Sequence, residues 1–224
     1  MVTGTAPRLR GGRKGRPPKI AREQIISAAL ELGIRDLTLA SIAQRLGVTL
    51  QALYHYVNDR DQLAEIVAEE IVSHYPLPVD DATDWAEWAV TFAHSQLSMF
   101  QSFPGLAQLA MRRTVPAAIA RLELSVMIAR RSGFDLTRAW WVTRAVQEFV
   151  FSWATREEIR QVALDKAGVS YHASLLGVID KTPGGAPNLR AAVEEIGEGR
   201  EMDRFEYTLR ALIAGLAMQR LTSS

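Results

Sequence analysis

Apolar residues recur at intervals of three and four positions through most of this chain, and no stretch shows sustained alternation of apolar and polar residues. The first spacing puts apolar side chains on one face of an α-helix, whereas alternation is the pattern of a strand with one buried face. We therefore predict an all-α fold of about nine or ten helices, with essentially no sheet.

Capping residues and breaks divide this helical pattern into segments. Thr38 and Thr49 precede the second and third apolar runs as expected N-caps. Asn58, with Asp61 three residues later, is expected to cap the fourth run. Residues 166–200 are only weakly patterned and contain an expected loop. The expected helices span about 21–32, 38–46, 49–57, 58–75, 85–100, 105–113, 116–132, 136–165 and 203–221.

The chain divides at residues 74–84, which hold two prolines and three acidic residues. We expect a domain boundary there, near Pro76. Residues 1–19 are rich in glycine, proline and arginine and have no hydrophobic period, so they are predicted to form a flexible arm. The predicted organisation is a basic arm (1–19), a first domain (20–75) whose fourth helix leads onward, and a larger helical domain (76–224).

Charge is distributed unevenly along the chain, although the net charge is only +1. Residues 1–60 hold ten lysines and arginines against four acidic residues, a net of +6, and the rest of the chain carries −5. Seven of these basic residues lie in the first 22 positions, which hold no acidic residue. A basic end on an acidic body indicates a polyanionic partner, the alternative being a solvated basic tail.

Several classes of protein are disfavoured by what the sequence lacks. Cysteine is absent, which excludes disulfides and thiolate metal sites and fits a cytoplasmic protein. No apolar run is long enough to span a membrane, and no apolar stretch of a secretory signal follows the basic N-terminus. The four histidines lack metal-ligand spacing, and Glu157-Glu158 is expected on a solvated helix face. We therefore predict that the protein is not an enzyme and that it holds neither a metal nor a cofactor.

Residues 37–60 have the pattern of a helix-turn-helix: a helix, a turn at Gly47 and a short second helix. The inward apolar residues that would fix the crossing of the two helices are Ile42, Leu46, Val48, Leu53 and Val57. The outward face of the second helix consists of Leu50, Gln51, Tyr54 and His55. Such a face suits a major groove, because glutamine pairs with adenine edges, leucine meets thymine methyl groups, and tyrosine and histidine reach phosphates or base edges.

This segment resembles the DNA-binding domain of the tetracycline-repressor (TetR) family over about residues 20–70. The residues that carry the resemblance are Ile25-Ile26-Ser27-Ala28-Ala29-Leu30-Glu31-Leu32, Gly33-Ile34, Leu37-Thr38, Ile42-Ala43, Leu46-Gly47-Val48, Leu53-Tyr54-His55-Tyr56-Val57, Asp61 and Leu63. The chain departs from the family pattern in a short first helix and in Ala40, which stands where many members have a base-reading arginine.

The resemblance implies that residues of the helix-turn-helix bind DNA in two ways. Base reading is implied for His55 and for the start of the second helix, Leu50, Gln51 and Ala52. Contact with the phosphate backbone is implied for Thr38, Thr49, Tyr54, Tyr56 and Arg60.

The arm has a motif of its own. Lys14-Gly15-Arg16-Pro17-Pro18-Lys19 resembles the Gly-Arg-Pro core of an AT-hook. An extended arginine between glycine and proline fits the narrow minor groove of A·T-rich DNA. We expect A·T-rich flanks to be bound by Arg13, Lys14, Arg16 and Lys19, the alternative being non-specific charge neutralisation.

The resemblance also implies a C-terminal helical domain with a ligand cavity and a dimer face. All five tryptophans lie in this part of the chain, and its aromatic side chains recur at helical spacing. Together they favour a cavity for a flat, apolar ligand, the alternative being an ordinary core. The expected ligand-binding residues are Trp88, Phe92, Gln96, Met99, Phe103, Met111, Trp141 and Gln147.

The last helix carries more apolar surface than a solvent-facing helix needs. With residues 136–160 and their symmetry mates it is predicted to form a four-helix dimer interface, the alternative being burial within the monomer.

Together these features predict a homodimeric transcriptional regulator that binds a palindromic operator in double-stranded DNA. A small apolar or aromatic effector is expected to release it, as from a repressor. Two recognition helices would enter successive major grooves about 34–36 Å apart, and the effector would act by moving the fourth helix. A transcriptional activator, or an architectural DNA-binding protein without a ligand, is the alternative on the same fold.

Overall fold

The computed structural model describes residues 20–80 and 84–222, and this part of the chain is all-helical, as predicted. It contains eleven α-helices and a terminal 3-10 helix at Met218–Thr222. The α-helices are α1 (Arg22–Leu32), α2 (Leu39–Leu46), α3 (Leu50–Leu53), α4 (Arg60–His74), α5 (Trp85–Ser102), α6 (Leu106–Ala110), α7 (Pro116–Arg131), α8 (Leu136–Ala167), α9 (Tyr171–Asp180), α10 (Pro187–Ile196) and α11 (Glu201–Ala217).

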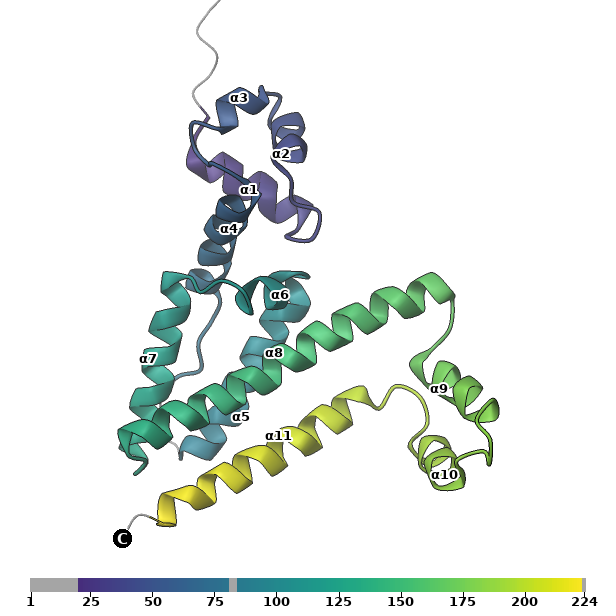
Figure 1. Ribbon diagram of the computed structural model, residues 1–224. Helices are drawn as coiled ribbons and strands as arrows, with labels where there is room; N and C mark the ends of the chain where they lie inside the picture. Colours follow the sequence, from purple (N-terminus) through teal and green to yellow (C-terminus); the bar gives the residue numbers. More distant parts are fainter. Residues whose placement is uncertain (1–19, 81–83, 223–224) are drawn as a thin grey trace, which may run out of the picture.

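Helices α1, α2 and α3 form an N-terminal head that stands on the beginning of α4 (Figure 1). Helix α1 ends at Gly33, whose φ of 79° is a conformation that favours glycine. Its buried face, Ile25, Ala28 and Ala29, belongs to the core that α1 shares with α2 and α4. The first helix is therefore as short as the sequence indicated.

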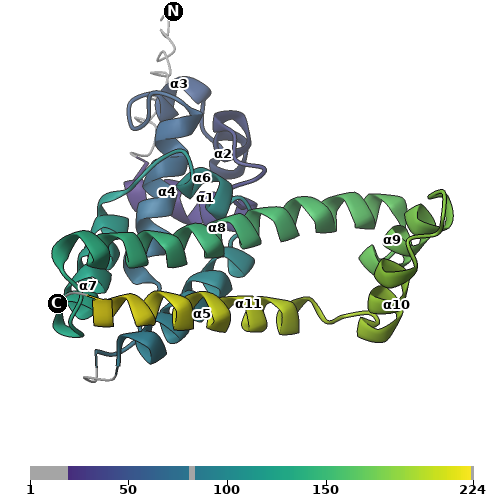
Figure 2. The same cartoon turned by 60° about the horizontal axis from the view of Figure 1, so that its bottom comes forward.

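Helix α4 connects the head to the rest of the protein, called the body here (α5–α8 and α11). One face of α4 is buried along its whole length, from Leu63 to Val72. Because α4 contributes buried residues to the core of the head and to that of the body, the two share one continuous apolar cluster. In the body, α5 and α7 pack against α8, and α11 lies beside α8 and α5 (Figure 2).

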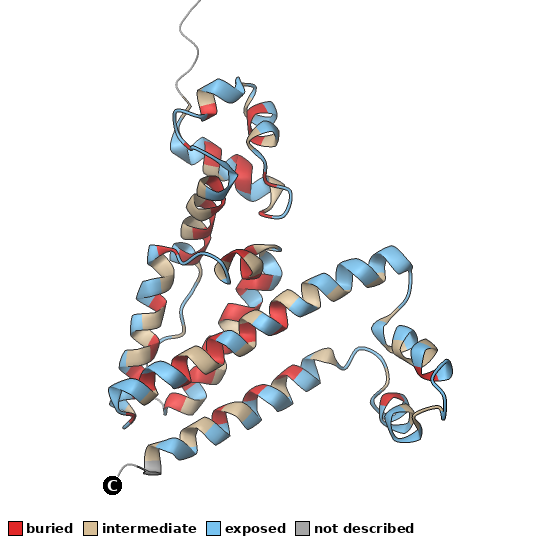
Figure 3. Ribbon diagram, viewed as in Figure 1, coloured by how far each residue is buried: buried red, intermediate tan, exposed pale blue. Residues whose placement is uncertain are grey.

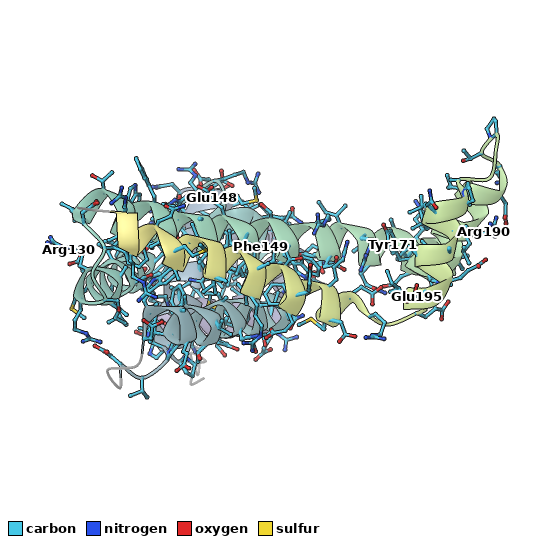
Figure 4. All side chains as sticks on the ribbon, turned by 90° about the horizontal axis from the view of Figure 1, so that it is seen from below. Arg130, Glu148, Phe149, Tyr171, Arg190 and Glu195 are labelled. Carbon is cyan, nitrogen blue, oxygen red and sulfur yellow. The ribbon has the colours of Figure 1, made fainter. Side chains whose placement is uncertain are left out.

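Aromatic side chains fill the body. Trp88 stacks on Phe92 with ring centroids 4.8 Å apart. On α11, Phe205 meets the Phe149 and Trp153 rings of α8 at 5.3 Å and 5.2 Å. Figure 4 shows Phe149 where α8 and α11 adjoin. These contacts place α11 inside the fold of the protomer.

Helices α9 and α10 pair with each other at the far end of α8 (Figure 1). The sequence pattern assigned no helix to residues 166–200, and the expected loop lies between α9 and α10. Each of the two helices buries a single residue, Ile179 or Val193, although apolar residues do recur at helical spacing, as in Leu189, Val193 and Ile196 of α10. Figure 3 shows that this pair is mostly exposed, whereas buried residues concentrate in α4, α5 and the inner faces of α7, α8 and α11.

Two predicted boundaries also need correction. Asp59 rather than Asn58 caps α4, because the Asp59 carboxylate accepts a hydrogen bond from the Gln62 N–H at 2.8 Å. The Asn58 N–H instead donates to the Gln62 side chain at 2.6 Å. Helix α11 begins at Glu201 and ends at Ala217, earlier at both ends than 203–221.

Candidate nucleic-acid interface and effector site

Two threonine caps define the helix-turn-helix formed by α2 and α3. The Thr38 hydroxyl accepts from the Ser41 N–H at 3.0 Å, and the Ser41 hydroxyl accepts from the Thr38 N–H at 3.1 Å. The Thr49 hydroxyl accepts from the Ala52 N–H at 3.2 Å. Between them Gly47 is left-handed, with φ of 65°, which ends α2 and reverses the chain. Both caps are as predicted from the sequence.

Apolar side chains beneath these two helices set their crossing angle. Leu37, Ile42 and Leu53 have no exposed surface, and Val57 is almost fully buried. Burial of each such side chain stabilises the fold by about 1.5–3 kcal/mol. The position of α3 on the head is therefore fixed by its core rather than by surface contacts.

The outward face of α3 and of the turn after it is exposed. Leu50 is 41% exposed and Tyr54 is 51% exposed, and Gln51 and His55 are exposed as well, whereas Ala52 is half-buried. This face lies on the head, at the end of the molecule away from α11 (Figure 1). The structure thus brings together four of the residues predicted to meet DNA and leaves their side chains accessible.

Two residues predicted to contact phosphates have partners within the head. The Tyr56 hydroxyl donates to the Ile20 carbonyl. Arg60 Nε donates to the Leu37 carbonyl at 2.8 Å and so ties the start of α4 to the loop between α1 and α2. The predicted arm residues Arg13, Lys14, Arg16 and Lys19 lie outside the described residues.

A carboxylate of α8 joins the head to the body. Glu158 Oε1 accepts from Arg35 Nη2 at 2.6 Å, and Glu158 Oε2 accepts from the Gly105 N–H at 3.1 Å. Arg35 lies in the loop between α1 and α2, and a Cβ atom on Gly105 would stand 3.2 Å from the Arg35 backbone nitrogen. The expectation that Glu158 is solvated is wrong: its side chain is 13% exposed because this junction covers it.

The predicted ligand-binding residues fall into two groups. Trp88, Phe92, Gln96, Met99 and Gln147 are buried in the body, on α5 and α8. Phe103 is half-buried at the end of α5, whereas Met111 and Trp141 are 58% and 61% exposed. The structure therefore gathers five of the eight inside the body and leaves Met111 and Trp141 on its surface.

Arg121 of α7 is a charged residue that sequence reasoning missed, and it is only 4% exposed. Its Nε and Nη2 atoms donate to the Val72 carbonyl at 3.1 Å and 3.0 Å, and Nη2 also donates to the Tyr75 carbonyl. These carbonyls belong to the end of α4, where a helix leaves its last acceptors unsatisfied. Burial lowers the pKa of the Arg121 guanidinium from its usual value, yet a guanidinium remains charged in proteins. Its spacing from Ser125 and Ile128 on one face of α7 is the signal that could have revealed it.

The interior of the body contains buried polar atoms as well as aromatic rings. The Ser125 and Thr143 hydroxyls pair at 3.1 Å across α7 and α8. Four buried side-chain atoms have no hydrogen-bond partner among residues 20–80 and 84–222: Trp88 Nε1, Gln96 Oε1, Arg121 Nη1 and Arg160 Nε. Buried polar groups nearly always have partners, so these atoms are positions at which an internal water or a ligand can bind.

A cavity of about 60 Å³ lies within the body, between α4, α6, α7 and α8. Its wall includes Val72, Leu106, Leu109, Leu122, Gln147 and Phe151. Small-molecule sites are usually about 300–1,000 Å³, so this cavity is several times too small for a drug-sized molecule. A ligand can enter here only if the helices that line it move.

Comparison with known proteins places the chain in a family. Residues 77–220 match the family model described as "Tetracyclin repressor-like, C-terminal domain". This match covers more than half of the chain, so the protein belongs to the tetracycline-repressor family of DNA-binding transcriptional regulators. The match in the C-terminal part of the chain thereby confirms the family resemblance that the sequence of the N-terminal helices indicated.

Individual relatives agree with this assignment. The tetracycline repressor protein class A from transposon 1721 of Escherichia coli is 28% identical over 212 residues, which cover 91% of this chain and 93% of that protein. An HTH-type transcriptional regulator of Saccharopolyspora erythraea is 26% identical over 148 residues, 63% of each protein. The Streptomyces coelicolor TetR family protein ActR, solved in complex with actinorhodin, is 25% identical and superposes with a TM-score of 0.77 over 93% of this chain and 100% of its own.

The described residues also bear on other kinds of site. None of the helices in residues 20–80 and 84–222 combines the length and apolar composition needed to cross a membrane. In the same ranges no three His, Cys, Asp or Glu side chains come together as a potential metal site.

The Arg35–Glu158 junction yields a first prediction. In a double-mutant cycle of Arg35→Ala and Glu158→Gln, we expect a coupling energy of about 0.5–1 kcal/mol, because Arg35 is half exposed and solvent screens the pair. The measurement is urea unfolding of the full chain. Arg45→Ala with Glu31→Gln is the control, since that pair lies within the head and both side chains are about half exposed. A coupling energy for Arg35–Glu158 no larger than that of the control would contradict a contact that joins head and body.

Proposed function

We propose that this protein is a homodimeric repressor that binds a palindromic operator through α3 and is released by a small aromatic effector bound inside the body. The observation that supports it most is the contrast on α3 between a fully buried inner face and an exposed outer face of Leu50, Gln51, Tyr54 and His55. The proposal includes a cytoplasmic location and no catalytic activity, in line with relatives that are transcriptional regulators.

On DNA, α3 would lie in the major groove. Gln51 would pair with an adenine edge and Leu50 would meet a thymine methyl group, while Ala52 allows close approach. Tyr54 and the capping threonines would reach phosphates, and His55 a base or a sugar. Tyr56 and Arg60 would contact phosphates while keeping the head bonds to Ile20 and Leu37. The arm residues Arg13, Lys14, Arg16 and Lys19 would enter the minor groove of A·T-rich flanks.

The dimer would form on the outward faces of α8 and α11. Part of the apolar surface of α11 that the sequence assigned to this interface is used inside the protomer, where Phe205, Leu209 and Ile213 are buried. What remains outside is a strip of small residues on α11, Ala211, Ala214 and Gly215, which allows close approach of a second helix pair. Large exposed apolar side chains adjoin it, including Tyr207 of α11 and Trp141 of α8.

Effector binding would reach the heads through the helices around the small cavity. The cavity wall includes Ala68 and Val72 of α4, so a molecule that enlarges the cavity displaces α4 or the helices opposite it. The wall also includes α6, and the turn before α6 contacts the head through Gly105 and Glu158. The effector would weaken DNA binding only by the difference between its affinities for the two arrangements.

An activator of the same fold, or a DNA-binding protein without an effector, is the competing function. Footprinting distinguishes a repressor from an activator, since a repressor's operator overlaps the promoter it controls. Screening of small aromatic molecules for release of bound DNA decides the second. Release by none of them would support the architectural alternative.

Substitutions on α3 give a second prediction. Gln51→Ala should change which base is preferred at one operator position, because it removes a base-edge contact worth about 1–3 kcal/mol of discrimination. Tyr54→Phe should weaken binding to all operators by about fivefold through loss of one phosphate hydrogen bond. Selection from random DNA followed by gel shifts measures both effects.

Gln101→Ala is the matched control for the glutamine substitution, since Gln101 is exposed at the end of α5 and away from α3. It should leave affinity and sequence preference unchanged. If Gln51→Ala and Gln101→Ala behave alike, α3 is not the reading element.

The dimer face gives a third prediction. Ala211→Arg should convert the dimer to a monomer, because a long charged side chain cannot be accommodated between closely packed helices. Sedimentation velocity at micromolar concentration measures the state. Ala120→Arg, on the exposed side of α7, is the control and should remain dimeric. A dimer that tolerates Ala211→Arg would place the interface elsewhere.

A further inference from the structure

We propose that Arg121 is the effector's anchor: the effector is an aromatic acid whose anionic group binds Arg121 and loosens its grip on the end of α4. This inference rests on the proposed function, and it adds the chemical class of the effector and the first step of release. It adds an anionic group to the small apolar or aromatic effector that the sequence suggested.

The charge of Arg121 is the first argument. All of its hydrogen bonds in the described chain go to the backbone carbonyls of Val72 and Tyr75, and it forms no ion pair with a carboxylate of the described residues. Isolated buried charges are unfavourable unless they are paired and hydrogen-bonded. The carbonyls at the end of α4 compensate this charge in part, through the negative end of the helix. An anion would compensate it fully.

The unused donor is the second argument. Arg121 Nη1 is buried and has no partner in the described part of the chain. A guanidinium presents its donors as a planar fork that matches a carboxylate. One oxygen of an anionic group would gain a charge-assisted hydrogen bond at Nη1, and its second oxygen would compete with the Val72 and Tyr75 carbonyls for Nη2.

The position of Arg121 is the third argument. Helices α7 and α8 pack against each other and diverge from the turn that joins them (Figure 1). Arg121 lies one helical turn before Ser125, whose hydroxyl pairs with that of Thr143 on α8. Gln147 lines the cavity, as do Leu122, which is next to Arg121, and Val72, whose carbonyl Arg121 binds. A molecule that enlarges this cavity thus moves residues that adjoin or bind Arg121, which itself lines the adjacent groove with Tyr75 and Pro116.

The consequence for α4 follows from competition for the same donors. An anion is a stronger acceptor than a neutral carbonyl. When it draws the guanidinium toward itself, the Val72 and Tyr75 carbonyls lose their donors and the end of α4 is released. The head, which stands on the other end of α4, then changes its position relative to the body.

The test compares two flat probes that differ in charge, 2-naphthoic acid and its neutral amide 2-naphthamide. Calorimetry with the full-length protein measures binding, and fluorescence anisotropy with a selected operator measures DNA release. We expect the acid to bind at least about tenfold more tightly than the amide and to release the DNA. Arg121→Gln should bring the acid-to-amide affinity ratio close to one.

Arg130→Gln is the matched control, because Arg130 is on the same helix but exposed and points away from the body (Figure 4). It should keep the acid preference of the unaltered protein. If Arg121→Gln does not fold, Arg121→Lys is the variant to use, because lysine keeps the charge but lacks the planar fork. The acid-to-amide affinity ratio should then fall severalfold, and hydrogen exchange at the end of α4 should become faster.

Three results would overturn the inference: equal binding of acid and amide, no binding of the acid, or an acid preference that persists in Arg121→Gln. Equal release of DNA by both probes would leave the proposed repressor intact while removing its anion anchor. Failure of the α3 substitutions to affect DNA binding would remove the proposed function itself.

Discussion

The last carbonyl groups of α4 need hydrogen-bond donors, and a buried guanidinium from another helix supplies them. Arg121 binds the Val72 and Tyr75 carbonyls, and nearby the Glu69 carboxylate of α4 accepts from the N–H of Ala117 at the start of α7 at 2.9 Å. At its other end α4 is tied to the head through Arg60 and the Leu37 carbonyl. Because α4 is held at both ends, its orientation is set by the body and passed to the recognition helix.

A tightly packed body makes this connection useful for regulation. Cores are close-packed and respond to an inserted molecule by shifting whole elements rather than by deforming locally. The cavity of about 60 Å³ adjoins α4, α6, α7 and α8, so few movements can enlarge it without disturbing the supports of the head. The second connection, from Glu158 to Arg35 and Gly105, lies on another side of the same junction. In the proposed mechanism, these two contacts of different chemistry would couple ligand binding to the position of the head.

Much of the fold was accessible from the sequence because its helices have strong caps and one apolar face. Thr38, Gly47 and Thr49 fix the helix-turn-helix by local rules, and the exposed face of α3 follows from the same register. The α9–α10 pair was missed although Leu189, Val193 and Ile196 recur at helical spacing, because each helix is only ten residues long and a glycine- and proline-rich loop separates the two. Arg121 and Glu158 were missed for a different reason. Their roles depend on partners about 50 or more residues away, which spacing along one helix cannot reveal.

The central claim is that the grip on the end of α4 sets the positions of the two heads in the dimer. The absence of cysteine allows one label to be placed on each protomer through Gln44→Cys, at an exposed position of α2. Pulsed electron paramagnetic resonance then measures the distance between the two heads with and without Arg121→Gln. The account predicts a narrow distance distribution for the protein with Arg121 and a broader or displaced one for Arg121→Gln. Identical distributions in folded dimers would contradict it.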